Sequence, residues 1–300
     1  MFDWGRAICY SGYREGQSPK TCTYPTYDQI VEDLKILDEM EFKYIRMYDP
    51  ISYAEMTCQV IRDLGLDMKV MLGPDLISEV NNPGCPWLKE TYTDEELVNR
   101  AKRNDNNIEK LIEIANNYSD VINAVSVGNE NTPKWGANNV PVERLIEFAD
   151  RLREGTGKPV TFNEGAFEWV ELEELAKHLD IISVHSYPLW YGNTVEEALE
   201  VNKTWYNKIK EMYPDKFVLF SEVGWATDCA DFKQMKEGQA NEENQKKYYD
   251  AFWNWTDREQ IIAYMFEAFD EPWKGGNRPN EAEKNWGIYR VDRTPKLMLN

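Results

Sequence analysis

The two residues best suited to do chemistry in this 300-residue chain are Glu130 and Glu222. Each follows a short apolar run, and the small residues Gly128 and Gly224 beside them leave room for a ligand. A carboxylate at the end of a buried run is costly unless it is paired or used. Two carboxylates that face each other at roughly 5 Å are what retaining hydrolysis of a glycosidic bond requires. The alternative is that either glutamate only forms a salt bridge with Arg46 or a nearby lysine.

The elements that must position these glutamates form an alternating pattern along the whole chain. Short apolar runs indicate strands buried on both faces, and amphipathic repeats between them indicate helices. The expected strands lie at 7–13, 43–49, 67–73, 122–130, 159–165, 181–188, 217–225 and 262–273. The clearest helical patterns lie at 26–40, 94–118, 141–155, 168–179, 194–213 and 241–258.

Eight strands, each but the last followed by a helix, predict a parallel (β/α)8 TIM barrel. No linker, repeat or low-complexity tract interrupts the pattern, so we expect one catalytic domain over 1–300. The residues after the last strand show no convincing helical pattern, so the eighth helix is either vestigial or lies beyond the end of this sequence. An open doubly wound sheet is the structural alternative, but no GxGxxG motif follows any strand to support it.

Polar residues gather where the expected strands end, which is where a barrel carries its catalytic groups. Strands four and seven lie on opposite sides of the barrel mouth, so Glu130 and Glu222 can face each other across a substrate. The other strand-end residues are Arg46, Tyr48, Asp49, Asn129, Glu164, His185, Tyr187, Trp225, Glu267, Asp270 and Glu271.

Composition excludes several classes of protein. The chain has 34 basic and 53 acidic residues, a net charge of −19, and no basic run, which argues against a nucleic-acid or anionic-membrane partner. No apolar stretch is long enough to span a membrane, and the N-terminus lacks the pattern of a signal peptide. Two histidines and five cysteines without metal-ligand spacing predict no metal and no cofactor. The aromatic share of 13% is compatible with sugar binding.

The motifs "YIRMYDP", "SVGNE", "SVHSYP", "SEVGW", "YMFEAFDEPWK" and "NWGIYRVDRTPK" occur in the order found in glycoside hydrolase family 17. The chain resembles this family of β-1,3-glucanases and glucanosyltransferases over essentially its whole length. The resemblance implies a retaining double displacement in which Glu130 is the acid/base and Glu222 the nucleophile. It also implies that Asn129 binds the sugar 2-hydroxyl and that Arg46 keeps Glu222 ionised.

Further binding residues are expected around this pair. Tyr187 would bind the nucleophile or the sugar ring, unless it only packs at the rim. Glu267, Asp270 and Lys274 match a family motif for sugar hydroxyls, with a surface salt-bridge cluster as the alternative. Candidate stacking or polar contacts are Tyr10, Tyr48, Asp49, His185, Trp225 and Trp273. Loop residues Trp87, Trp135, Trp190 and Trp286 could line outer subsites or simply pack.

Two departures from the family pattern affect the shape of the cleft. Ala226 stands where the family usually has proline, and the segment 73–96 is specific to this chain and could wall off one end of the cleft.

The sequence therefore favours a monomeric hydrolase of β-1,3-glucan or its oligosaccharides. A glucanosyltransferase with the same two glutamates and a non-catalytic glucan-binding barrel are the alternatives. A metal-dependent hydrolase is disfavoured, because the strand ends offer only His185 as a nitrogen ligand. A polymeric glucan substrate would imply a secreted or periplasmic protein, although the chain itself carries no signal for either.

Overall fold

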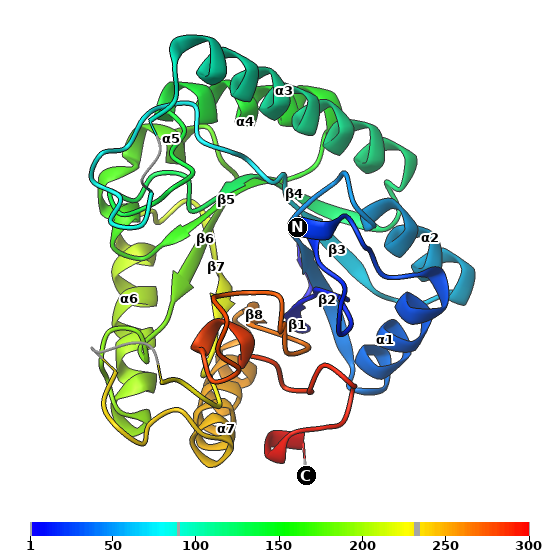
Figure 1. Ribbon diagram of the computed structural model, residues 1–300, viewed down its shortest axis with the longest axis vertical. Coiled ribbons are helices and arrows are strands. Elements are labelled where there is room, and N and C mark those ends of the chain that lie inside the picture. The colour runs from blue at the N-terminus through cyan, green and yellow to red at the C-terminus, as the bar shows by residue number, and fades with distance from the viewer. Residues whose placement is uncertain (1, 89–90, 231–234, 300) are drawn as a thin grey trace.

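Eight parallel strands close into a barrel in the order of the chain (Figure 1). The computed structural model describes residues 2–88, 91–230 and 235–299. The strands are β1 (Arg6–Cys9), β2 (Phe42–Met47), β3 (Lys69–Leu72), β4 (Ile122–Asn129), β5 (Val160–Gly165), β6 (Ile181–Ser186), β7 (Phe217–Val223) and β8 (Ala263–Met265). β1 pairs with both β2 and β8, which closes the ring. The predicted (β/α)8 barrel is confirmed.

Helices surround the barrel and follow the first seven strands (Figure 1). They are α1 (Tyr27–Glu39), α2 (Ala54–Leu64), α3 (Asp94–Asn117), α4 (Val142–Thr156), α5 (Glu173–Lys177), α6 (Val195–Met212) and α7 (Glu242–Glu259). Local sequence fixes where several of them begin. Thr26 and Thr93 each cap a helix through reciprocal bonds with the residue three positions later, Gln29 and Glu96.

The helix expected over 168–179 is not continuous. A 3₁₀ turn at Glu168–Glu171 precedes the short helix α5. The reason is Trp169, which is fully buried and donates from Nε1 to the carbonyl of Ser183 at 2.9 Å. Turning the chain at this point places a large aromatic ring against the barrel wall, and that burial outweighs a longer helix.

Buried ion pairs hold the segment after β8, where the described residues form only 3₁₀ turns, at Ala282–Lys284 and Leu297–Leu299. Arg293 contacts both carboxylate oxygens of Asp33 on α1, at 2.7 and 2.8 Å, and its guanidinium lies over the ring of Phe269. Lys296 contacts Asp270 at 2.7 Å. Among the described residues no α-helix follows β8, and these charged contacts hold the segment against the barrel instead.

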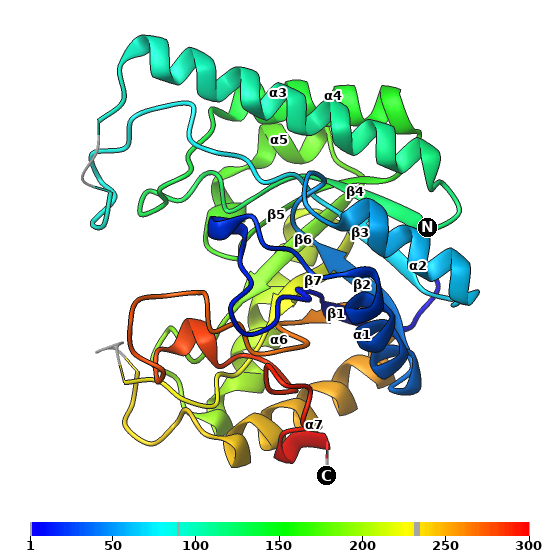
Figure 2. The ribbon, with the colours of Figure 1, turned by 45° about the vertical axis from the view of Figure 1, so that its right-hand side comes forward.

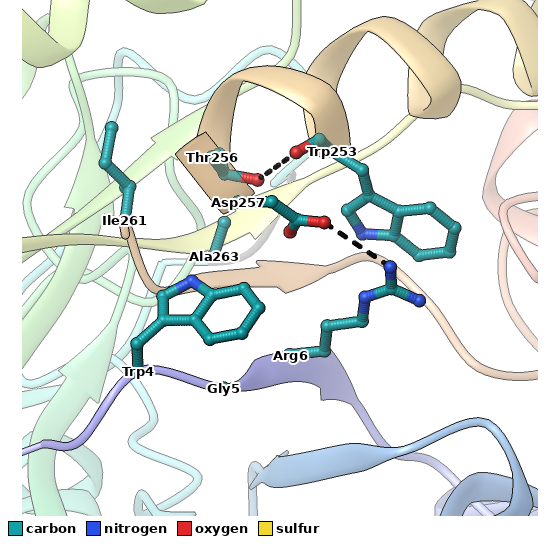
Figure 3. Close-up of a pocket in the computed structure, with 8 residues that line it drawn as sticks. All are labelled: Trp4, Gly5, Arg6, Trp253, Thr256, Asp257, Ile261 and Ala263. Atoms are coloured by element: carbon teal, nitrogen blue, oxygen red, sulfur yellow. Dashed lines mark hydrogen bonds and ion pairs between the residues drawn. The ribbon is translucent and has the colours of Figure 1, made fainter. Parts of the chain in front are cut away.

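A small cavity of about 10 Å³ lies at the amino end of the barrel, between the starts of β1 and β8 (Figure 3). Trp4, Arg6, Trp253 and Asp257 are among the residues that line it, and Arg6 contacts Asp257 at 3.4 Å. A volume of this size holds about one water molecule. The cavity is therefore a packing feature, at the opposite end from the polar strand ends.

Replacing Arg293 should destabilise the fold more than its position near the end of the chain suggests. Arg293→Ala leaves Asp33 buried with Arg14 and Tyr10 as its remaining partners, so we expect a loss of about 1.5–3 kcal/mol in the free energy of unfolding. Urea denaturation measures this loss. The matched control is Arg258→Ala, an exposed arginine at the end of α7, which should change stability by less than about 0.5 kcal/mol. Equal effects of the two variants would contradict the proposed role of the tail contacts.

Candidate active site

A buried ion pair joins β2 to β7 across the carboxyl end of the barrel. Arg46 Nη1 donates to Glu222 Oε1 at 2.6 Å and to the carbonyl of Ser221 at 3.0 Å. The two side chains are only 2% and 7% exposed, so neither charge is appreciably hydrated. Arg46 is one of the largest fully buried side chains among the described residues. The ion pair fixes Glu222 in the barrel mouth.

Two tyrosines complete the hydrogen bonds of Glu222. Tyr48 donates to Oε1 at 2.9 Å and Tyr187 donates to Oε2 at 2.5 Å. Burial alone would raise the pKa of Glu222, but His185, Arg46 and these two hydroxyl groups lower it to about 2. Glu222 is thus an ionised carboxylate with both oxygens held in place. This is the state that a carboxylate nucleophile needs.

Glu130 lies beside Glu222 and is the more accessible of the two, with 30% of its side chain exposed. It follows the last residue of β4 and takes a positive φ of 48°. Its amide N–H donates to the carbonyl of Asn163 on β5 at 2.9 Å, which holds this turn in place. The turn directs the Glu130 carboxylate toward His185, whose Nδ1 lies 2.9 Å from Glu130 Oε1.

His185 contacts Arg46 as well as both glutamates. Nε2 lies 3.3 Å from Arg46 Nη1, and Nδ1 carries the proton that is donated to Glu130 Oε1. Nδ1 also lies 3.6 Å from Glu222 Oε2. His185 therefore lies between the two carboxylates and orients Glu130.

Asn129 is held next to this cluster by both its side chain and its backbone. Its Oδ1 accepts a hydrogen bond from Arg46 Nη2, and its backbone N–H donates to Asn131 Oδ1 at 2.9 Å. Gly128 is needed here, because a Cβ at this position would clash with Asn131 Oδ1. With its oxygen occupied by Arg46, Asn129 offers its NH₂ group as the donor to a ligand.

A second charged cluster follows β8. Lys274 Nζ contacts Glu267 Oε2 at 3.1 Å and forms an ion pair with Glu271, which also accepts from Trp273 Nε1 at 2.9 Å and from Ser11. Burial and the charge of Glu271 raise the pKa of Glu267. Burial would also raise the pKa of Glu271, but Lys274 lowers it. The structure thus brings Glu267 and Lys274 together in a buried network, not in a salt-bridge cluster on the surface.

Three residues expected to bind substrate lie elsewhere. Tyr10 is 1% exposed and its hydroxyl contacts Asp33 at 3.1 Å. Trp225 is fully buried and donates from Nε1 to the carbonyl of Gln239 at 2.9 Å. Asp270 contacts Lys296 and accepts from the backbone N–H of Gly287 at 3.0 Å. Tyr10 and Trp225 are too deeply buried to offer a stacking surface to a sugar. Asp270 is engaged in a structural ion pair with Lys296. These contacts argue against the substrate-binding roles expected for the three residues.

The other expected binding residues have mixed positions. Trp273 is half-buried and packs edge-on against Tyr13. Asp49 is half-buried and accepts from the backbone N–H of Ile51 at 2.9 Å. Trp286 is 1% exposed and lies 5.1 Å from the ring of Tyr187, so it supports the site from behind rather than lining an outer subsite.

Three further carboxylates lie around the site with no assigned role from sequence. Burial and the charge of Glu130 raise the pKa of Glu164, which accepts from Thr132 Oγ1 at 2.7 Å. Burial likewise raises the pKa of Glu168, and the charge of Glu130 adds to it. For Glu283, burial and the charges of Glu130 and Glu222 raise the pKa, while Lys274 opposes them. Glu164 had the strand-end signal, whereas Glu168 and Glu283 lie in turns that have no such signal.

Glu130, His185 and Glu222 also have the composition of a metal-binding group, since their ligand atoms lie within 4.8 Å of one another. The Glu222 oxygens, however, already accept from Arg46, Tyr48 and Tyr187. The Arg46 guanidinium brings a positive charge to the place where a cation would bind. The donor set therefore fits a carboxylate pair better than a metal centre.

The low pKa of Glu222 predicts a specific dependence of stability on pH. Because the pKa of Glu222 falls from about 4.3 in the unfolded chain to about 2 in the folded protein, its contribution to stability is present above pH ~4.3 and is lost as pH falls toward 2. Between pH 5 and pH 3 the parent should lose about 1.5 kcal/mol more than Glu222→Gln. Denaturant unfolding at both pH values measures the difference. Glu211→Gln, at an exposed position of α6, should follow the parent, and parallel pH curves for Glu222→Gln and the parent would refute the assigned ionisation.

Solved structures of related architecture cover nearly the whole chain. An endo-laminarinase from Formosa Hel1_33_131 superposes with a TM-score of 0.82, at 22% identity, over 98% of this chain and 85% of that chain. A glycoside hydrolase family 17 β-1,3-glucanosyltransferase from Rhizomucor miehei gives a TM-score of 0.75, at 22% identity, over 97% and 95%. At this level of identity the likeness establishes the fold.

Curated relatives match the sequence at slightly higher identity. The chain is 28% identical over 201 residues to a glucan 1,3-β-glucosidase of Arthroderma benhamiae, covering 59% of this chain and 61% of the relative. It is 26% identical over 311 residues to a probable glucan endo-1,3-β-glucosidase btgC of Aspergillus clavatus, covering 94% of this chain and 40% of the relative. The chain thus spans less than two thirds of the length of either relative.

In the part of the chain that the structure describes, no helix combines the length and the hydropathy needed to cross a membrane. The family model for the BtgE/BtgC glycoside hydrolase domain matches residues 7–287, which include every strand of the barrel except the first residue of β1, and both glutamates of the site. The chain belongs to the BtgE/BtgC glycoside hydrolase domain family.

Proposed function

We propose that this chain is a retaining glycoside hydrolase of the family 17 type that cleaves β-1,3-glucan. The observation that carries the proposal is the carboxylate pair, with one oxygen of Glu130 and one of Glu222 within 4.8 Å of each other. Retaining enzymes place their two carboxyl groups about 5–5.5 Å apart, whereas inverting enzymes need about 6.5–9.5 Å to admit a water molecule. The short separation favours direct attack by one carboxylate.

In the first step Glu222 attacks the anomeric carbon while the bond to the leaving sugar breaks. Glu130 donates its proton to the leaving oxygen, and the His185 Nδ1–H, 2.9 Å from Glu130 Oε1, stabilises the carboxylate that forms. The hydrogen bonds from Arg46, Tyr48 and Tyr187 align Glu222 before the reaction. The product of this step is a covalent glycosyl-enzyme ester.

In the second step Glu130, now ionised, takes a proton from water, which attacks the ester and releases the sugar with its original configuration. The same hydrogen bonds then favour the departure of Glu222, because they stabilise its negative charge. If a sugar hydroxyl takes the place of water, the product is a longer glucan. This is the transferase alternative, and the two glutamates serve both outcomes.

The choice of a β-1,3-glucan substrate is supported by the activities for which the relatives are named and by the polar groups around the pair. Asn129 presents its NH₂ group to the sugar 2-hydroxyl, a contact that strengthens in the transition state. Glu267 and Lys274 provide further partners for hydroxyl groups. A glucan outside the cell would place the protein there as well. The ionised, fully bonded Glu222 disfavours a non-catalytic binding barrel.

The roles of the two glutamates can be separated by chemical rescue. With an aryl β-laminaribioside, Glu222→Ala should lose activity by about 10⁴-fold or more, and azide should restore it while forming the α-glycosyl azide. Glu130→Ala should slow the second step by about 10²–10⁴-fold, and azide should yield the β-glycosyl azide. NMR of the products reads both outcomes. Undiminished activity of Glu222→Ala would refute the assignment. So would a β-glycosyl azide from Glu222→Ala together with an α-glycosyl azide from Glu130→Ala.

The stereochemistry and the choice between hydrolysis and transfer can be followed in one time course of laminari-oligosaccharide digestion. We expect the β-anomer to appear first by ¹H NMR, before mutarotation, because double displacement retains configuration. At low substrate concentration the product sizes should all be smaller than the substrate. Products longer than the substrate at high concentration would assign the chain to the transferases instead, and an initial α-anomer would exclude both.

A further inference from the structure

Two strongly exposed tryptophans from different loops meet at the carboxyl end of the barrel. Trp87, from the segment after β3, is 60% exposed, and Trp135, from the segment after β4, is 45% exposed. Their ring centroids lie 6.0 Å apart and the rings are tilted by 52°. Figure 1 and Figure 2 show the segment after β3, in cyan, reaching out beyond the barrel on the side of its carboxyl end.

The loops that carry this pair are fastened to each other by side-chain amides. Asn82 Nδ2 donates to the carbonyls of Lys134 and Gly136 at 2.9 and 2.8 Å. Asn81 exchanges two hydrogen bonds of 2.8 Å with the backbone of Tyr92, which ties the two ends of the segment together. The tryptophan pair is therefore presented on a braced support, and a ligand would not have to order it.

The exposure of these two rings contrasts with that of three other tryptophans near the catalytic end, Trp169, Trp225 and Trp286, which are at most 1% exposed. Indole rings in water forgo the burial energy that the other tryptophans gain, so two of them held together mark a surface that contacts a ligand. An aromatic face suits the C–H face of a sugar ring.

We propose that Trp87 and Trp135, together the Trp87–Trp135 platform, bind outer glucosyl units of the glucan whose reacting linkage lies between Glu130 and Glu222. This inference rests on the proposed function and adds a binding site to it. The platform stands on the loops of β3 and β4, and Glu130 follows β4, so one chain can run from the reacting linkage to the platform. Two tilted rings fit a chain that curves, as β-1,3 linkages make it do, better than a flat ribbon.

The platform should affect long substrates and not short ones. We expect Trp87→Ala/Trp135→Ala to raise KM for laminarin about 10-fold or more, because two stacking contacts are lost, with kcat unchanged. KM for laminaritriose, which is too short to leave the cleft, should stay within twofold of the parent. Trp87→Phe/Trp135→Phe should recover most of the affinity for laminarin. Trp4→Ala is the matched control, an exposed tryptophan at the amino end of the barrel, and should change neither KM (Figure 3).

Binding can also be measured apart from catalysis by electrophoresis through a gel that contains laminarin. The parent and Trp4→Ala should be retarded, and the double alanine variant should migrate as in a gel without laminarin or close to it. If the parent is retarded in this way but hydrolyses no glucan, the platform stands and the proposed function fails. The platform is refuted if the double alanine variant keeps the laminarin KM and the retardation of the parent. It is also refuted if this variant loses activity on laminaritriose as strongly as on laminarin.

Discussion

The ion pair between Arg46 and Glu222 is the interaction on which the rest of the site depends. Two charges removed from water inside a barrel are expensive unless every donor and acceptor around them is used. Here Arg46 also serves the Ser221 carbonyl and Asn129, and Glu222 also accepts from two tyrosines. The site residues contributed by β2, β4, β6 and β7, or by the residues that directly follow them, can thus be understood as the set that satisfies this one pair.

The same pair makes the two glutamates chemically different. Glu222 is enclosed by donors and remains ionised, whereas Glu130, at the turn after β4, meets one imidazole and is open to solvent. A carboxylate that holds its charge suits attack on carbon, and a carboxyl group with access to water suits proton transfer. Identical side chains acquire separate roles because one lies inside the network of Arg46 and the other lies at its edge.

Much of this arrangement could be predicted from the sequence. Glu130, Glu222, Arg46 and His185 each follow or end an apolar run, and a parallel barrel brings such residues to one edge. All eight strands overlap the expected apolar runs for the same reason, because burial on both faces leaves a plain signature. The bounds are less accurate, since β8 covers only Ala263–Met265 of the expected 262–273. Helix α2 also has a buried face, but its apolar residues are not among the clearest helical patterns of the sequence.

The remaining positions depend on which way a side chain points after the strand has ended, and sequence periodicity carries no information there. Trp225 and Asp270 follow strands as Glu130 does, yet one turns into the core and the other meets Lys296 from far along the chain. Glu283 reaches the site from a turn that has no repeating pattern. Contacts between distant loops decide these cases.

The segment after β8 contacts residues 286–299, the tail of the described chain, through backbone hydrogen bonds as well as ion pairs. Glu267 exchanges backbone hydrogen bonds with Trp286 and Ile288, and Asp270 donates to the carbonyl of Tyr289, so residues 267–270 lie as a short ribbon against 286–289. Docking of the tail and placement of Glu267 are consequently one event. If a sugar binds Glu267 as proposed, thermodynamic linkage requires that it stabilise the docked tail, and that a loosened tail weaken its binding by the same factor.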